Sequence, residues 1–257
     1  MPGTNPEIFL LTLYLMAASF FVVALVYSSV GMGGGSSYTA LMAIFGMNIL
    51  AIPVISLTLN LMVTSVGSFN FIRNHHARFK LILPFLFSSI PMAYIGGTLE
   101  LPANLFYWVL LISLIFVAAR IYLWKTVSIN LDLTSRGKLI ISIISGSVLG
   151  LIAGIVGIGG GIYLVPLIII LGLGTEKEAA ACGAIFIWLN SLSGLASRFQ
   201  INEINLIDYW PLVPAVLVGG LMGSYMGSFR FSAKKIDKIL GLVVIVATAL
   251  LVKKLVF

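Results

Sequence analysis

Charged residues are scarce in this 257-residue chain. They make up 9% of it, whereas soluble domains carry roughly 25%. Hydrophobic residues make up 60%, and the mean hydropathy is +1.13. The eight acidic residues all lie at or near the ends of apolar runs, so none is expected in the centre of a membrane. This composition excludes a soluble enzyme and a membrane-embedded hydrolase, and it predicts an all-α polytopic membrane protein.

Residues that hold metals are also few. Cys182 is the single cysteine, which excludes a disulfide framework and a Cys-rich metal site. We expect it to serve packing, with contact to a sulfur substrate as the alternative. His75 and His76 lie in a basic loop without further ligands nearby, so we predict that they are solvated. No metal and no cofactor is expected.

Acidic residues are outnumbered, which gives a formal net charge of +7. Such a balance can indicate nucleic acid binding, but here the bases form short groups beside the apolar runs. Bases in these places hold loops on the cytoplasmic side of a membrane. We therefore expect the lipid bilayer, and no nucleic acid, as a partner. The first apolar run lacks a basic leader and a cleavage site, so we expect it to stay as a helix of a multi-pass membrane protein.

What the chain has in plenty is glycine, and two glycine strings interrupt long apolar runs. GMGGG at 31–35 returns as GIGGG at 157–161. Glycine is a poor helix former, and a broken helix inside a bilayer leaves backbone groups that need protein, water or a ligand as partners. Two such breaks at matching places predict a binding site. Close helix packing is the alternative for glycines in membranes.

The apolar runs form about ten helical segments, five in each half. They cover 7–30, 36–48, 51–72, 80–99 and 104–124, then 138–156, 162–173, 178–198, 208–228 and 234–254. Besides the glycines, Leu59-Asn60 matches Leu189-Asn190. A repeat of about 126–130 residues predicts two similar bundles. We place the first membrane repeat at 1–126, a polar linker at 127–137 and the second repeat at 138–257.

Loop charges predict that the two repeats are inverted. The loop at 73–80 holds three bases and no acid, whereas the equivalent loop at 198–208 holds one base and two acids. The next pair reverses the bias, with Glu100 alone in the first half and four bases against one acid at 230–238. Inversion requires an odd number of crossings in each half. Each half is therefore expected to contain a glycine-broken re-entrant or half-helix pair plus three membrane helices.

Each glycine string precedes a short helix, and a helix N-terminus is a ready anion site. If the repeats are inverted, both N-termini can point at one small anion. The repeat-matched asparagines are expected there as well, because a buried amide is costly without a partner. Arg198 is expected either to snorkel at a helix end or to line an anion entry path. The predicted substrate-binding residues are Gly31, Gly33, Gly34, Gly35, Ser36, Ser37, Thr39, Asn60, Gly157, Gly159, Gly160, Gly161, Asn190 and Arg198.

The paired glycine motifs, the repeated Leu-Asn and the later Gly97-Thr98 and Gly223-Ser224 turns resemble the TauE/SafE sulfite exporter family, also called the toluene sulfonate uptake permeases. The resemblance covers nearly the whole chain. It implies eight membrane helices, a number compatible with ten segments if each half-helix merges with its neighbour. It also implies a location in a prokaryotic inner membrane and the transport of sulfur-containing anions such as sulfite, sulfoacetate or related organosulfonates.

The sequence thus predicts a secondary transporter for a small sulfur-containing anion, working by alternating access. An anion channel of the same architecture and a non-transporting membrane scaffold subunit are the alternatives. The coupling ion, H⁺ or Na⁺, stays open, as do the direction of transport and the oligomeric state.

Overall fold

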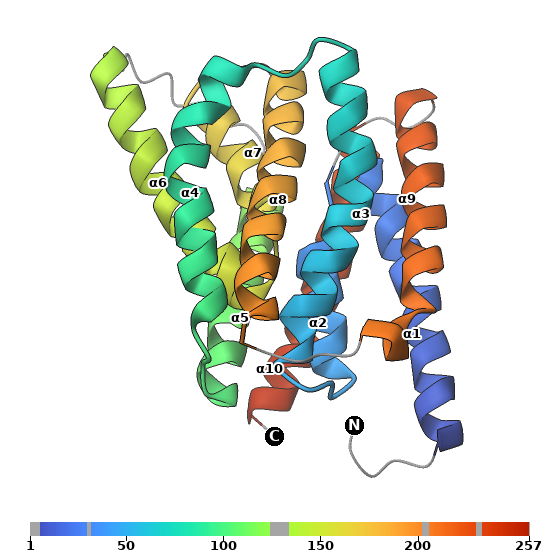
Figure 1. Cartoon of the computed structure of the whole chain (residues 1–257). Helices are drawn as coiled ribbons and strands as arrows, with labels where there is room; N and C mark the ends of the chain where they lie inside the picture. The colour runs from blue at the N-terminus through green and yellow to red at the C-terminus, as the bar shows by residue number, and fades with distance from the viewer. Residues whose placement is uncertain (1–5, 30–31, 124–133, 202–205, 230–232, 257) are drawn as a thin grey trace.

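The computed structural model describes residues 6–29, 32–123, 134–201, 206–229 and 233–256. Within these ranges the chain is all-helical, with eight α-helices of 18 to 24 residues and two of ten residues (Figure 1). The elements are α1 (Pro6–Ser28), α2 (Gly35–Ile44), α3 (Ala51–Arg73), α4 (Phe79–Thr98), α5 (Ala103–Leu123), α6 (Ser135–Val156), α7 (Gly161–Ile170), α8 (Glu176–Phe199), the 3-10 turn η1 (Leu206–Tyr209), α9 (Leu212–Phe229) and α10 (Ala233–Val256).

Five helices are long and apolar enough to cross a membrane, judged over the described residues. These candidate spans lie in α1, α3, α4, α6 and α8. Large apolar side chains cover the outside of the bundle, among them Phe87, which is 82% exposed, and Ile112, which is 64% exposed. Water would penalise such a surface, whereas lipid tails match it. The exposed belt therefore suits a bilayer.

The two short helices α2 and α7 are separate elements, so eight long helices remain. Helices α2 and α7 end earlier than the apolar pattern indicates, and they end in the same way. Gly46 and Gly172 adopt positive φ angles of 73° and 61°. The amides of Met47 and Leu173 then bond to carbonyls five residues back, which is the Schellman arrangement. The turn chemistry, and not loss of hydrophobicity, sets these ends.

Two other helices begin at residues that differ from the expected ones. α8 begins at Glu176 because Thr175 and Glu178 form a capping box before it. The expected helix at 208–228 is divided instead into η1 and α9. Pro211 accounts for the division, since proline disfavours helical conformation at the residue before it.

Helices α3 and α8 stand side by side in the middle of the bundle (Figure 1). Helix α4 packs against α6 on one flank, and α1 packs against α9 on the other. Small residues permit both flank contacts, because Gly154 abuts the carbonyl of Ala93 and Gly223 abuts that of Leu25. The α3 helix runs up the view in Figure 1 while α8 runs down it, and α1 and α6 are likewise opposed.

Candidate functional site

The two short helices begin at left-handed glycines. Gly34 (φ 88°) is the N-cap of α2 and Gly160 (φ 77°) is the N-cap of α7. Their carbonyls accept hydrogen bonds from the amides of Tyr38 and Leu164, one turn further along. The first amides of each helix have no partner within that helix. Each glycine string therefore ends in a positively polarised helix N-terminus inside the bundle.

Asn60, on α3, is where the two strings meet. Its side chain is fully buried, and its Nδ2 donates a hydrogen bond of 3.3 Å to the carbonyl oxygen of Ile158 in the second string. A Cβ built on Gly33 would lie 2.6 Å from Asn60 Oδ1, and one built on Gly159 would lie 3.1 Å from Asn60 Nδ2. Glycines from both halves thus contact a single amide, at a distance that a side chain on either would prevent.

Ser56 joins the same two breaks one turn earlier on α3. Its hydroxyl donates to the carbonyl oxygen of Gly157 at 2.7 Å and lies 3.3 Å from that of Gly35. Thr39 donates to Ser56 Oγ at 3.0 Å. Sequence reasoning missed Ser56. The available signal was its spacing of four residues from Asn60, which places both on one face of the helix.

The hydroxyls expected to bind an oxyanion already have protein partners. Ser36 and Ser37 hydrogen-bond with the hydroxyl of Tyr27, at 3.0 and 2.8 Å, and this contact braces α1 against α2. Thr39 is engaged by Ser56. In this conformation the three hydroxyls therefore support the break, and their contact with an anion stays a prediction.

Asn190, the repeat partner of Asn60, occupies a different setting. Its Nδ2 donates back to the carbonyl oxygen of Phe186 at 2.8 Å, within α8. The α8 side chains nearest to Gly159 are Ile187 and Ser191. Ser191 Oγ is buried and lies 3.1 Å from a Cβ built on Gly159, which makes it the α8 hydroxyl at the meeting point. Ser191 thus contacts the second glycine string, and a contact of Asn190 with the substrate stays a prediction.

The remaining predicted glycines are surrounded by packing. A Cβ on Gly34 would lie 2.9 Å from the hydroxyl of Tyr38, and one on Gly160 would lie 2.8 Å from the ring of Phe186. Gly161 faces Ile187 and the backbone of Gly183. Gly31 lies outside the described residues.

Arg198 does not snorkel, and that expectation is wrong. Its side chain is only 3% exposed, and Nη2 donates at 2.8 Å to the carbonyl oxygens of Gly154 and Ile155. The reason is that the last carbonyls of α6 lack partners within the helix, and a cation also complements the negative end of the helix dipole. Of the described residues, Arg198 is the one buried side chain with a formal charge, and the two carbonyls that it contacts belong to residues just before the second glycine string.

Cys182 and His75 lie as the sequence suggests. Cys182 is free and fully buried in the second turn of α8, and His75 is exposed between α3 and α4. His76 is half-buried instead, with its ring centroid 6.5 Å from that of Phe71. Over the described residues, no three His, Cys, Asp or Glu side chains gather where they could hold a metal ion.

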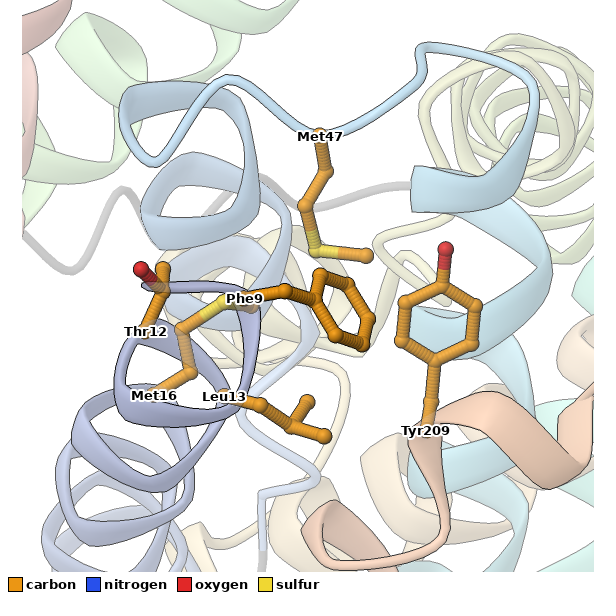
Figure 2. A pocket seen from close by; sticks show the side chains of 6 residues that line it. All are labelled: Phe9, Thr12, Leu13, Met16, Met47 and Tyr209. Atoms are coloured by element: carbon orange, nitrogen blue, oxygen red, sulfur yellow. The ribbon is translucent and has the colours of Figure 1, made fainter. Parts of the chain in front are cut away.

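A separate pocket lies near the beginning of α1 (Figure 2). Tyr209 of η1 faces Met47 and Phe9 across it, so both halves of the chain form its wall. Burial is the larger cause and the negative charge of the neighbouring Asp208 the smaller cause of a raised pKa of Tyr209. The hydroxyl of Tyr209 is therefore neutral. The lining offers no cation for an anion: it consists of Phe9, Thr12, Leu13, Met16, Met47 and Tyr209.

Comparison with known proteins agrees with this architecture. Residues 15–251 match the sulfite exporter TauE/SafE family. The probable membrane transporter protein y4hK of Sinorhizobium fredii is 33% identical over 237 residues, which cover 90% of this chain and 95% of that protein. The probable membrane transporter protein YunE of Bacillus subtilis is 33% identical over 98 residues, covering 38% of this chain and 36% of that protein.

No solved structure matches the chain significantly. The family match spans most of the helices described above and confirms the expected multi-pass transporter, as opposed to an enzyme. The chain is therefore a membrane transporter that belongs to the sulfite exporter TauE/SafE family.

Proposed function

We propose that the chain is a secondary transporter of a small sulfur-containing anion, such as sulfite, sulfoacetate or a related organosulfonate. The anion binds where the two glycine strings meet, and the two halves of the chain alternate its access to either side of the membrane. The observation that carries the proposal is the convergence of both strings on Asn60.

The charges around this point favour an anion. Two helix N-termini open at the strings, each equivalent to a partial positive charge of about 0.5 e. Arg198 covers the carbonyl end of α6, so the negative end of that helix does not face the site unopposed. The described core holds no buried carboxylate that would repel an anion.

Glycine at these positions leaves the backbone open to a ligand. The contacts of Asn60 with Gly33, Ile158 and Gly159 close the strings around the amide in this conformation. Opening would separate the second string from α3 and expose backbone N–H groups together with the amide. Close approach of an oxyanion to such groups needs no lysine or arginine.

Inverted repeats are part of the proposal. The packing between the two halves supports the inverted repeats. The first-half helix α1 packs on the second-half helix α9, and the second-half helix α6 packs on the first-half helix α4. The opposed directions of α3 and α8 in Figure 1 also fit. Such an arrangement permits two equivalent conformations that face opposite sides.

A binding assay on the purified protein tests the site. Sulfite, sulfoacetate, chloride, acetate and phosphate are compared for their effect on the melting temperature, since a ligand that binds only the folded state stabilises it. We expect sulfite to stabilise the parent and the Asn70→Ala control, in which the replaced side chain is exposed on the same helix. Asn60→Ala should bind sulfite at least about tenfold more weakly, a loss of about 1.4 kcal/mol. Equal stabilisation of Asn60→Ala would refute the site.

A further inference from the structure

The amide of Asn60 is only half satisfied. Its Nδ2 donates to the carbonyl oxygen of Ile158, and a carbonyl can pair only with the NH₂ end of the amide. This bond fixes which atom faces Gly33, and that atom is the acceptor Oδ1. Oδ1 is fully buried and has no hydrogen-bond partner among the described residues. A buried acceptor without a donor is costly, so its presence in the site calls for a ligand that supplies one.

The same arrangement recurs at Asn190. There Nδ2 donates to the carbonyl oxygen of Phe186, and Oδ1 again has no partner in the described part of the chain. Both repeat-matched amides therefore offer an acceptor, while the N–H groups of the glycine strings offer donors. A ligand that satisfies the Asn60 site must carry acceptor oxygens and a hydrogen-bond donor together.

Two kinds of ligand could pair with Asn60 Oδ1, a metal cation or an acidic O–H group. The charges decide between them. The helix N-termini of α2 and α7 are positively polarised, the buried Arg198 carries a formal positive charge, and the described core holds no carboxylate. These charges disfavour a cation at the strings and are compatible with an anion that keeps one proton.

We propose that the site selects the singly charged, protonated form of the sulfur oxyanion, hydrogensulfite over sulfite, with the O–H group donating to Asn60 Oδ1. This inference rests on the proposed function and names the species that the site binds. The oxyanion oxygens accept from the backbone N–H groups of the strings. A proton then crosses the membrane on the substrate, so proton coupling needs no titratable side chain in the core.

The binding of three probes to the parent protein between pH 6 and 9 tests the proposal, and it depends on no variant. The probes are sulfite, selenite and methanesulfonate. Hydrogenselenite loses its proton at a higher pH than hydrogensulfite, and methanesulfonate is a monoanion without an O–H group at any of these pH values. We expect the apparent Kd of sulfite to rise about tenfold per pH unit once hydrogensulfite is deprotonated. The same rise for selenite should begin at a higher pH, and methanesulfonate should bind weakly and independently of pH.

If the affinities for sulfite and selenite begin to fall at the same pH, the titrating group belongs to the protein and not to the ligand. That result overturns the proposal. Sulfite binding that does not change with pH but still requires Asn60 also overturns the selection of hydrogensulfite. That result leaves the proposed transporter function standing. Asn60→Ala adds a second readout. It should bring the affinities for hydrogensulfite and methanesulfonate to within about twofold of each other, whereas Asn70→Ala should keep the parent's preference.

Discussion

At the scale of single residues, the proposed site depends on the absence of side chains. Gly33 and Gly159 let Asn60 reach both strings. The repeat points to all three residues in the sequence, and their contact with an anion stays a prediction. The sequence does not predict Ser56, because the spacing of four residues from Asn60 places this serine on the same helix face without showing which carbonyls it meets. It does not distinguish the two alternatives for Arg198, because a base at the end of an apolar run looks the same whether it faces lipid headgroups or the last carbonyls of another helix; the structure excludes the first.

Gly35 and Gly67 provide a matched pair of helical glycines. A Cβ on Gly35 would lie 2.8 Å from the carbonyl oxygen of Ile158 and collide with Asn60 Nδ2, whereas one on Gly67 meets only Ala184 at 4.0 Å. We expect Gly35→Ala to push the strings apart, lower the melting temperature and weaken sulfite binding at least about tenfold. Gly67→Ala should bind like the parent and gain up to about 1 kcal/mol of stability, because alanine is the better helix former. Thermal unfolding with and without sulfite measures both effects, and parent-like binding by Gly35→Ala would contradict the close approach.

At the scale of elements, helix ends determine the site. α2 and α7 share a left-handed glycine cap and a Schellman end, so each is a ten-residue unit that no apolar pattern could delimit. The apolar runs predict the existence of all ten described α-helices, since each run is long and apolar enough to form one. They predict the helix ends poorly, because the ends depend on turn residues such as Gly46 and Pro211.

The end of α6 can be tested through Arg198. Replacing it by methionine removes the donor to Gly154 and Ile155 and leaves two buried carbonyls without that partner. We expect Arg198→Met to lose about 1–3 kcal/mol of stability in the absence of any anion. Arg198→Lys should recover part of this loss, because an ammonium group also carries charge and donors. An unchanged melting temperature with loss of sulfite binding would instead make Arg198 a direct ligand of the anion.

At the scale of the whole molecule, bases of the described residues gather at one end of the central helices. Arg73, Arg78 and Lys80 gather where α3 ends and α4 begins, and Arg78 pairs with Glu178 at the beginning of α8 at 3.6 Å. The loop at 198–208 contains one base, Arg198, and the structure buries it. The loop's remaining charges are therefore acidic, which strengthens the prediction that this loop lies outside the cell. The sequence could predict this charge bias, but it could not predict which helix of one half packs on which helix of the other, since that depends on side-chain packing.

Thiol labelling in intact cells tests the inverted arrangement. Cys182 is fully buried and serves as an unreactive background. We expect a membrane-impermeant maleimide to label Gln200→Cys from outside, because that residue is exposed after α8, and to label Asn74→Cys only after the cells are opened. Labelling of both positions from the same side would contradict inversion.

Flux in proteoliposomes is the sharpest test of whether the two glycine strings and Asn60 form one transport site. We expect the uptake of radiolabelled sulfite by the parent to be saturable and to be accelerated by unlabelled sulfite on the opposite side, as alternating access requires. We expect the same for Asn70→Ala and at least about tenfold slower uptake by Asn60→Ala, equivalent to about 1.4 kcal/mol. Uptake that is linear in concentration would exclude alternating access, and uptake by Asn60→Ala that equals the parent's would exclude Asn60 from the transport site.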